Sequence, residues 1–288
     1  MQRALIDRSG GHVVVLHPGE MGAAVAAAAV RAGARVVWCA DGRGPATAAR
    51  AEQAGLVRTE SLAEALDGAG TVLSICPPAA ADVTADAVLA LGFTGIFVDA
   101  NAVSPERASR IGERVTAAGG TAVDGALFGS RRDRPGSRFA LSGAGAPAVA
   151  ALFGEGNGLT ATVLDGDVGA ASALKMAHST FQKAARPLAA LAFALAAEHG
   201  VTEQLLDEAQ DSRSPLAEPG MVSVAASKAW RWEPELHEVM ATLDASGLPS
   251  GMVAEAAALL AAWEPMRDDR SAPLTAALAA LRRVSPPG

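Results

Sequence analysis

Cysteine is scarce in this sequence: Cys39 and Cys76 are the only two among 288 residues. They form neither a disulfide framework nor the spacing of a metal site, so we expect a reducing cytoplasm and no bound metal. An excess of positive charge is lacking as well, because the formal net charge is -7 at pH 7. This charge argues against nucleic acid or an anionic membrane as the main partner.

A long apolar segment is also lacking. The first ten residues contain no apolar run typical of a signal peptide. The longest strongly apolar run farther on, residues 188–197, is much shorter than the ~20 residues that cross a bilayer. We therefore expect a soluble protein. Apolar residues still make up 50% of the 288 residues, which suffices for a sizeable core in one large or two ordinary domains.

The sequence does contain a strand–loop–helix pattern, in residues 12–30. Residues 13–16 (VVVL) form a continuous apolar run that predicts a strand buried on both faces. A short loop follows, and then an alanine-rich helix that Gly33 ends. In such a unit, backbone N–H groups and the helix dipole converge on an anion such as a pyrophosphate. The predicted cofactor-binding residues of this loop are His17, Pro18, Gly19, Glu20, Met21 and Gly22.

This loop matches the dinucleotide fingerprint G-x-G-x-x-G at its last two glycines, while His17 stands at the first position. Gly19 would let a cofactor approach the backbone, and Gly22 would let the helix pack against the strand. The place of the loop, directly after a buried strand near the start of the chain, favours a dinucleotide site. The alternative is an ordinary turn between a strand and a helix.

The residues after the second predicted strand, residues 35–39, bear on which dinucleotide binds. In this place an acidic residue takes the 2′-hydroxyl of NAD, and an arginine accepts the 2′-phosphate of NADP. Asp41 and Arg43 are both present, and Thr47 adds a hydroxyl in the next predicted helix. We favour NADP over NAD, since a charge-assisted arginine–phosphate contact contributes ~1.5–3 kcal/mol. Asp41 then points outward.

Strands and helices alternate as far as residue 164. Alternation with short connections is typical of a doubly wound parallel sheet, so we expect an α/β Rossmann-type NAD(P)-binding domain in residues 1–165. Ser104 is a natural N-cap for the helix that Pro105 begins. The further predicted strands are residues 71–75 (closed by Cys76, Pro77 and Pro78), 96–98, 121–123, 137–142 and 159–164.

Beyond Gly166 the strand signals stop and the pattern is helical. One long helix is predicted over residues 168–199, with a kink or a break at Pro187. We expect an all-helical domain for substrate binding and dimerisation in residues 166–288. The other predicted helices are residues 202–211, 221–229, 233–245, 252–263 and 273–284.

Lys175 is the first candidate for chemistry. On a helix it shares one face with Ser179, Gln182 and Arg186, with His178 beside them, while the other neighbours are small or apolar. An ammonium group at the expected domain junction is a suitable proton donor to an oxygen that gains charge during hydride transfer. The alternative is a solvated lysine.

Four segments, in the same order, resemble motifs of the β-hydroxyacid dehydrogenases, which include 3-hydroxyisobutyrate and 6-phosphogluconate dehydrogenase. Residues 16–22 (LHPGEMG) are similar to the cofactor loop, and residues 99–105 (DANAVSP) to the D-x-S-T-x-x-P segment beside the nicotinamide. Residues 124–130 (DGALFGS) resemble the D-x-P-V-S-G-G substrate loop, and residues 166–175 (GDVGAASALK) the segment of the catalytic lysine. The C-terminal part, with residues 228–232 (KAWRW), looks more like poorly characterised phosphogluconate-dehydrogenase-like oxidoreductases.

The resemblance implies a Rossmann-type cofactor domain and hydride transfer at the nicotinamide, with Lys175 as proton donor or acceptor. It implies that Asn101 and Ser179 orient the substrate. It also implies cofactor contacts for Asn101 and for the loop of Cys76, Pro77 and Pro78. The residues that would line the substrate site are Gly125, Leu127, Phe128, His178 and Gln182.

The sequence departs from this family in its substrate half. Ser179 stands where the family has an asparagine, and Ala171 replaces the second glycine before the lysine. Asn101 and Ala102 replace a serine and a threonine. Phe128 aligns with the serine of the substrate loop and cannot hydrogen-bond a carboxylate. We therefore expect a substrate that is bulkier or less polar than a standard small hydroxyacid.

We predict an NADP(H)-dependent oxidoreductase, with NAD as the alternative cofactor, that transfers hydride between nicotinamide and a carbonyl or alcohol substrate. We expect a homodimer, because long alanine-rich helices with Trp230, Trp232 and Trp263 offer more apolar surface than one small domain buries. Residues 131–134 (RRDR) are interpreted as a solvated loop, with an anionic ligand as the alternative. An imine reductase and a dinucleotide-binding sensor without turnover stay open, although the presence of Lys175 favours carbonyl chemistry.

Overall fold

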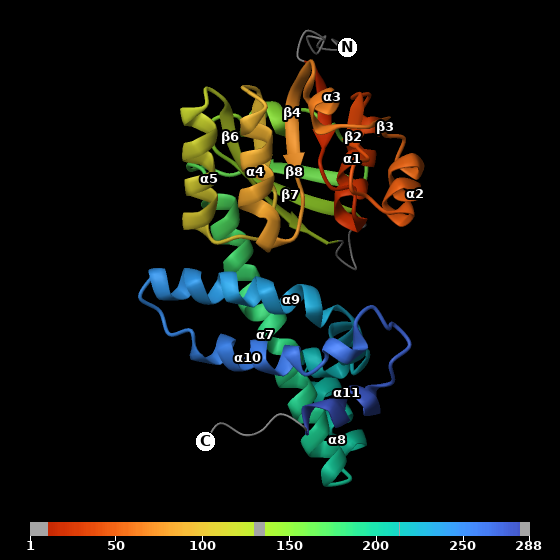
Figure 1. Cartoon of the computed structure of the whole chain (residues 1–288). Helices are drawn as coiled ribbons and strands as arrows, with labels where there is room; N and C mark the ends of the chain where they lie inside the picture. Colours follow the sequence, from red (N-terminus) through yellow and green to blue (C-terminus); the bar gives the residue numbers. More distant parts are fainter. Residues whose placement is uncertain (1–10, 130–135, 213, 283–288) are drawn as a thin grey trace. The chain divides into compact units, whose positions relative to one another are not determined.

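The computed structural model describes residues 11–129, 136–212 and 214–282 (Figure 1). The chain divides into two compact units, Met1–Lys175 and Met176–Gly288. A mostly parallel sheet with interleaved helices is followed by an all-helical region, which confirms the predicted fold class. The division falls later than the boundary expected after residue 165, because Ala171 in the first turn of the long helix packs with residues of the sheet.

An eight-stranded sheet forms the centre of the first unit (Figure 1). Its strand order is β3-β2-β1-β4-β5-β6-β7-β8, and all neighbours are parallel except β6 and β7. The carboxyl ends of β1, β2, β4, β5 and β6 therefore lie at one edge, where open α/β sheets bind ligands. The strands are β1 (His12–Val15), β2 (Val36–Cys39), β3 (Val57–Thr59), β4 (Ala69–Ser74), β5 (Ile96–Asp99), β6 (Thr121–Phe128), β7 (Ser137–Ser142) and β8 (Leu159–Val163).

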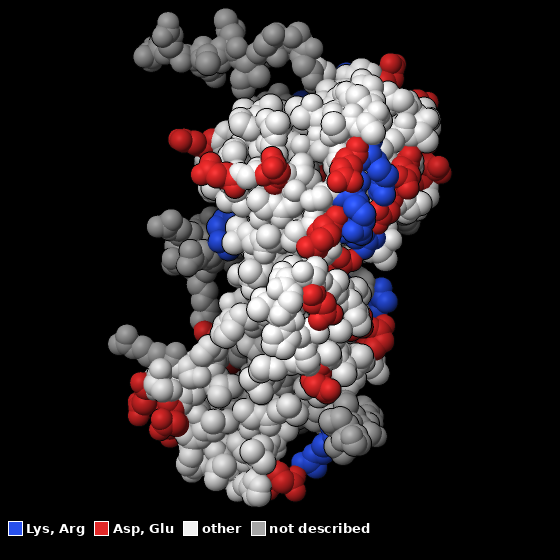
Figure 2. Space-filling view, turned by 90° about the vertical axis from the view of Figure 1, so that its left-hand side faces the viewer, with Lys and Arg blue, Asp and Glu red and all other residues white. Residues whose placement is uncertain are grey.

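Helices cover both faces of this sheet. Buried residues of α1, α2 and α6 share one apolar core with the strands, and those of α3, α4 and α5 share the other. On the surface, Arg107 and Arg114 of α5 form salt bridges with Asp82 of α4. Figure 2 shows acidic and basic side chains next to one another on one flank of this unit. The helices are α1 (Glu20–Arg31), α2 (Pro45–Gln53), α3 (Leu62–Leu66), the 3-10 helix η1 (Pro78–Ala80), α4 (Ala81–Ala90), α5 (Pro105–Ala117) and α6 (Ala146–Ala150).

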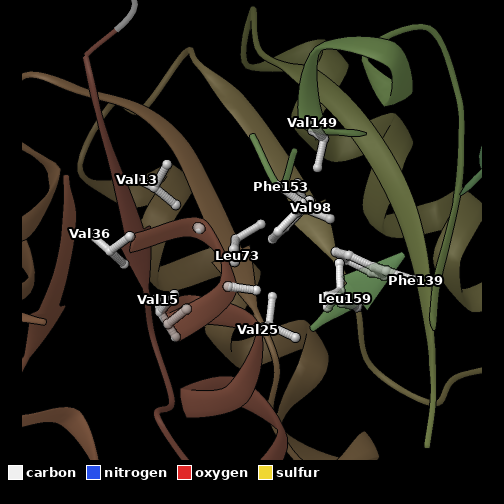
Figure 3. Close-up of a cluster of buried hydrophobic side chains, with 14 of the residues drawn as sticks. Val13, Val15, Val25, Val36, Leu73, Val98, Phe139, Val149, Phe153 and Leu159 are labelled. Atoms are coloured by element: carbon white, nitrogen blue, oxygen red, sulfur yellow. The ribbon is translucent and has the colours of Figure 1, made fainter. Parts of the chain in front are cut away.

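Strand β1 illustrates how the sequence builds these cores. Val13 and Val15 belong to the core that contains Val98, which Figure 3 shows, whereas Val14 and Leu16 belong to the core on the other face. Successive side chains of a strand point to opposite faces, so a continuous apolar run is buried on both sides. The strand predicted from this run is confirmed.

Two parts of the first unit differ from the sequence prediction. Strand β6 continues to Phe128, so residues 124–128, which the family resemblance places in a substrate loop, are a buried strand. Antiparallel pairing with β7 explains the extension, because each residue from Asp124 to Phe128 has a partner there. The sequence prediction also omits β3 and α3, although Ser61 caps α3 by accepting a hydrogen bond from the backbone N–H of Glu64.

The long helix α7 (Ala170–Glu198) passes from the first unit into the second as one element. A break at Pro187 is therefore wrong. Proline removes one backbone donor and disturbs the preceding turn. Pro187 is itself buried, as are Ala189 and Ala190 just after it, and this packing opposes the disturbance.

The described residues of the second unit form helices joined by loops. The segments predicted as two helices, residues 221–229 and 233–245, form the single helix α9 (Gly220–Ala245) despite Pro234, which is followed by the buried Leu236. Within the described part of the chain, no helix is long and apolar enough to cross a membrane. The remaining helices are α8 (Thr202–Asp211), η2 (Pro215–Ala217), α10 (Gly251–Ala261), η3 (Glu264–Met266) and α11 (Leu274–Leu281).

Candidate functional site

The loop between β1 and α1 has the features of an anion site. Gly19 is the N-cap of α1 and provides no side-chain cap, so a pyrophosphate would meet the first-turn backbone N–H groups without a competing capping side chain. A Cβ on Gly22 would lie 2.1 Å from the His17 carbonyl oxygen, whereas a Cβ on Gly19 would meet nothing within 4 Å. Close packing thus requires Gly22, whereas the space beside Gly19 is open. The other loop residues are Pro18, which is buried, and Glu20 and Met21, which are exposed.

His17 reaches the residues that follow β2. Its Nε2 lies 2.8 Å from Nη2 of Arg43. Burial, with a smaller contribution from the positive charge of Arg43, lowers the pKa of His17 to about 4. The imidazole is therefore neutral near pH 7 and accepts this hydrogen bond from the guanidinium. The sequence assigns both residues to the cofactor site, but it does not predict the bond between them.

The predicted ribose-side residues lie where the sequence places them. Asp41 and Arg43 are exposed after β2, and Thr47 is half-buried in α2. The Thr47 hydroxyl accepts a hydrogen bond from Nη2 of Arg50 at 3.1 Å, and Nε of Arg50 donates to the Pro18 carbonyl oxygen at 3.3 Å. Arg50 thus connects α2 to the cofactor loop. Sequence analysis missed it, although its spacing of three residues from Thr47 on a helix was a usable signal.

Asn101, just after β5, connects two strand ends. Its Oδ1 accepts a hydrogen bond from the Cys76 backbone N–H at 2.6 Å. Its Nδ2 donates to Ser74 Oγ at 3.1 Å and to Asp99 Oδ1 at 2.5 Å. The side chain is buried, and both of its amide hydrogens are used within the protein. Asn101 therefore fixes the loop after β4, and its contact with a cofactor or substrate stays a prediction.

That loop carries the predicted cofactor residues Cys76, Pro77 and Pro78. Pro78 begins the 3-10 helix η1, because proline is well suited to the first position of a helix. The Cys76 sulfur lies 3.8 Å from the Thr84 hydroxyl oxygen. Burial raises the pKa of the Cys76 thiol, which favours the protonated form of this group.

Two buried carboxyl groups, Asp99 and Asp124, occupy paired positions of β5 and β6. Burial chiefly, and the charge of Asp124 in addition, raises the pKa of Asp99 to about 7. Asp124 accepts hydrogen bonds from the backbone N–H groups of Gly169 at 3.0 Å and Ser172 at 2.8 Å, and from Ser172 Oγ at 2.7 Å. The Asp124 carboxyl group thus caps the amino end of α7. The resemblance includes Asp124 in a motif, but nothing in the sequence predicts this capping contact.

Lys175 follows this capped end of α7. Its Nζ donates a hydrogen bond to the Leu127 carbonyl oxygen at 2.7 Å and lies 5.1 Å from the centre of the Phe128 ring. A cation over an aromatic face is stabilised by the ring quadrupole. The ammonium group therefore lies at the carboxyl end of β6, beside two predicted substrate residues. A third, Gly125, is explained by packing, because a Cβ there would lie 2.6 Å from the ring of Phe139.

Ser179 belongs to the second unit, where it contacts a buried ion pair. Its hydroxyl donates to Glu235 Oε1 at 2.5 Å, and Glu235 Oε2 pairs with Lys183. The Lys183 ammonium also lies 6.0 Å from the centre of the Trp232 ring. Sequence analysis missed both members of this pair. Lys183 lies four residues after Ser179 on a predicted helix, which was a signal, whereas nothing in the sequence connects Glu235 to them.

The other residues predicted near Ser179 are placed differently. Gln182 and His178 are exposed, while Ser179 is buried, so these residues do not share one environment. Gln182 Oε1 instead accepts a hydrogen bond of 3.5 Å from Arg186. Residues 131–134 lie outside the described residues. In the described ranges, no group of His, Cys, Asp and Glu side chains is suited to hold a metal ion.

Comparison with known proteins gives two matching domain families. Residues 13–151 match the NAD binding domain of 6-phosphogluconate dehydrogenase, and residues 196–263 match a domain of unknown function, DUF1932. No curated protein matches the chain.

Solved structures share the fold at low sequence identity. The conserved protein MTH1747, described as having unknown function and structural similarity with 3-hydroxyacid dehydrogenases, is 25% identical, with a TM-score of 0.66 over 88% of this chain and 98% of that one. A 3-hydroxyisobutyrate dehydrogenase from Salmonella typhimurium is 20% identical, with a TM-score of 0.71 over 93% and 98% of the two chains. A reductive aminase from Aspergillus terreus is 15% identical, with a TM-score of 0.57 over 93% and 98%.

The strand-end loops, the uncapped start of α1 and the family match at residues 13–151 all concern the same part of the chain. The likeness to solved structures extends over the helical region as well. The first part of the chain is therefore similar to the NAD binding domain of 6-phosphogluconate dehydrogenase and the second to DUF1932, in a fold similar to that of a 3-hydroxyisobutyrate dehydrogenase.

Proposed function

We propose that the protein is an NADP(H)-dependent oxidoreductase that acts on a carbonyl or alcohol substrate, with Lys175 as the proton donor or acceptor. The observation that carries this proposal is the place of the Lys175 ammonium group. It lies at the carboxyl end of β6, on the same edge of the sheet as the loop between β1 and α1. A proton donor and a dinucleotide loop at one sheet edge are what reduction of a carbonyl group needs.

Residues of the first unit would hold the cofactor. The amino end of α1 receives the pyrophosphate through backbone N–H groups, with Gly19 leaving room for it. Arg43 binds the 2′-phosphate, because a guanidinium forms charge-assisted hydrogen bonds with phosphate oxygens. Bound NADPH would supply a hydride to an electrophilic carbon of the substrate.

Lys175 would then complete the reaction by donating a proton to the substrate oxygen. The Leu127 carbonyl oxygen and the Phe128 ring hold its ammonium group in one place, so less side-chain freedom is lost when a substrate binds. The Asp124 carboxyl group supports this placement through the helix end, because it fixes Gly169 and Ser172 before the lysine. Asp124 is thus a positioning residue.

Reduction of a C=N bond is the second candidate. The observation that keeps it open is Phe128, whose ring lies beside the Lys175 ammonium and which stands where the resembled dehydrogenases have a serine. A phenyl ring offers no hydrogen bond to a substrate carboxylate, so an apolar ketone or imine suits this wall better than a hydroxyacid. A dinucleotide-binding sensor without turnover is the remaining alternative.

The substitution Lys175→Met tests the proposal, since it keeps the helix propensity while it removes the charge and the proton. We expect turnover of carbonyl substrates to fall ~100-fold or more, with NADPH affinity changed by only a few-fold. NADPH oxidation would be measured against a panel of aldehydes, ketoacids and cyclic imines. Lys228→Met, the same change at a half-buried lysine of α9, is the matched control and should keep near wild-type turnover.

Each outcome of this panel has a distinct meaning. A Lys175→Met variant that reduces its carbonyl substrate at the wild-type rate would exclude Lys175 as the proton donor. Loss of C=O turnover with unchanged C=N turnover would favour the imine reductase. A wild-type protein that binds NADPH tightly but turns over no member of the panel would favour the sensor.

A further inference from the structure

His17 occupies the position at which the dinucleotide fingerprint has its first glycine, and it does not simply fill space there. The imidazole extends from the end of β1 to the residues after β2, where its Nε2 meets Nη2 of Arg43 at 2.8 Å. A histidine in place of glycine thus adds a side-chain hydrogen bond between the two loops that flank the adenosine half of a bound dinucleotide.

The chemistry of the two groups fixes the direction of this bond. A guanidinium is a cation with donors only, so Arg43 must donate and Nε2 of His17 must accept. The proton of the neutral imidazole then resides on Nδ1. Because burial and the Arg43 charge lower the pKa of His17 to about 4, the imidazole is in its neutral acceptor form near pH 7.

The backbone on both sides of the bond is held in place. The Arg43 N–H donates to the Ala40 carbonyl oxygen at 3.0 Å, in a turn where Gly42 has a φ of +67°. On the other side, the His17 carbonyl oxygen accepts a hydrogen bond of 2.8 Å from the Gly19 N–H. Each backbone is held by a hydrogen bond, and the bond between the side chains holds the exposed Arg43 side chain as well.

Arg50 adds a second connection between α2 and the cofactor loop. It connects α2 to the Pro18 carbonyl oxygen and to the Thr47 hydroxyl. The helix that begins just after Arg43 is therefore attached to the residue that follows His17. Arg50 is half-buried whereas Arg43 is exposed, so Arg43 is the arginine that a ligand at this end of the loop would meet.

We propose that His17 is a positioning residue for cofactor choice: it accepts a hydrogen bond from Arg43 and so holds the guanidinium where it meets the 2′-phosphate of NADP(H). This inference rests on the NADP(H) preference proposed above. An arginine that is already ordered loses less conformational entropy when the phosphate binds. NADH has no 2′-phosphate and gains nothing from the bond.

If His17 only stabilised the fold, replacing it would lower the melting temperature. The positioning role predicts otherwise. Nδ1 of His17 is buried and has no hydrogen-bond partner within the described residues. A buried donor without a partner destabilises the folded state. Replacing His17 by leucine should therefore leave the melting temperature unchanged or raise it, while it lowers the affinity for NADPH.

The experiment compares dissociation constants for NADPH and NADH, measured by titration of the nicotinamide fluorescence. We expect His17→Leu to weaken NADPH binding about 3–10-fold and to leave NADH within about 2-fold. His17→Gln, which keeps an acceptor of similar reach, should restore NADPH affinity to within about 2-fold of the wild type. His12→Leu, the same change at a histidine of β1 that binds the Ala65 carbonyl oxygen, is the matched control and should not alter the NADPH-to-NADH ratio.

A double variant completes the test. Arg43→Ala alone should weaken NADPH binding about 10–100-fold, and His17→Leu added to it should cause no further loss, because His17 acts through Arg43. Equal losses for both cofactors in His17→Leu, or an undiminished effect in the Arg43→Ala background, would overturn the positioning role alone. A wild-type protein that binds NADH as tightly as NADPH would overturn the positioning role together with the proposed NADP(H) preference. Hydride transfer itself is not measured, so the outcome does not depend on the substrate.

Discussion

The two units of the chain bury polar groups in different ways. In the first unit, buried polar side chains gather at the carboxyl ends of the strands, where Asn101, Asp99 and Asp124 connect loops and a helix end to the sheet. In the second unit, the Lys183–Glu235 pair lies inside a helical core and connects α7 to α9. One arrangement fixes the loops at an edge of the sheet, and the other joins two helices.

The units differ in their surfaces as well. Exposed large apolar residues of the first unit are scattered over separate elements, such as Val57 in β3 and Val83 in α4. Those of the second unit include several on the single helix α7. The sheet, covered by helices on both faces, can bury its apolar residues within one chain. The helical unit leaves several large apolar side chains exposed on one helix.

The largest effect is expected from breaking the ion pair of the second unit. Glu235→Ala leaves the Lys183 ammonium buried without its partner, which typically costs about 3–5 kcal/mol of unfolding free energy. Urea unfolding followed by circular dichroism measures the loss. Glu255→Ala, at an exposed glutamate of α10, is the control and should stay within about 0.5 kcal/mol of the wild type.

The double substitution Glu235→Leu with Lys183→Met sharpens this prediction. Replacing a buried pair by apolar side chains of similar volume is often neutral or stabilising, because the desolvation of both charges is avoided. We expect the double variant to be at least as stable as the wild type. A double variant as unstable as Glu235→Ala would mean that the hydrogen bond from Ser179 to Glu235, rather than the ion pair, stabilises this core.

The next effect concerns the strand-end carboxyl groups of the first unit. The folded state raises the pKa of Asp99 to about 7, so between about pH 4 and 7 the folded protein keeps a proton that the unfolded chain has lost. Stability contributed by this group is therefore fully present at low pH and is lost as the pH rises through this range, by up to about 4 kcal/mol.

Asp99→Asn removes this proton equilibrium while it keeps an oxygen that can accept the hydrogen bonds from Asn101. We expect the variant to gain stability relative to the wild type as the pH rises from about 4 to 7. Denaturant unfolding at a series of pH values checks it. A constant difference between the two proteins over this range would show that Asp99 is ionised throughout in the folded state.

Much of the first unit was predictable because its signals are local. The run at residues 13–16, the Ser104 cap with Pro105 and the glycine that ends α1 depend on neighbours a few positions away. The strand conformation of residues 124–128 was not predictable, since aspartate and glycine, which begin this segment, are poor strand formers. Their pairing with β7 (Ser137–Ser142) decides the conformation, and the local sequence of residues 124–128 does not reveal that partner.

The candidate site shows the same limit. Lys175 and His17 could be recognised because each lies in a motif with characteristic spacing. The partners that fix them could not, because the His17–Arg43 and Lys175–Leu127 bonds join residues from different elements. The sequence also overestimated the exposed apolar surface. Trp263 was expected to contribute to it but is fully buried, and its Nε1 donates a hydrogen bond to the Ala277 carbonyl oxygen.

The homodimer stays a prediction, but other residues now support it. Phe181, Leu188 and Leu195 lie seven residues apart on α7 and are 65%, 61% and 64% exposed. Residues at this spacing follow one line along a helix, as in the apolar seam between paired helices. We infer that a second copy of the chain covers this stripe, because the same stripe on two copies is complementary to itself.

The smallest effect is expected from a charge placed in this stripe, compared with the same charge placed on the first unit. Leu188→Glu places a charge in the middle of the proposed seam and should raise the dissociation constant of the dimer about 10–100-fold, or about 1.4–2.8 kcal/mol. Light scattering over a range of micromolar concentrations measures the mass. Leu91→Glu, at a 49% exposed leucine of the first unit, is the control and should leave the dimer intact. A wild-type protein that is monomeric at these concentrations would contradict the inference, and α7 would then be an apolar helix that one chain tolerates in water.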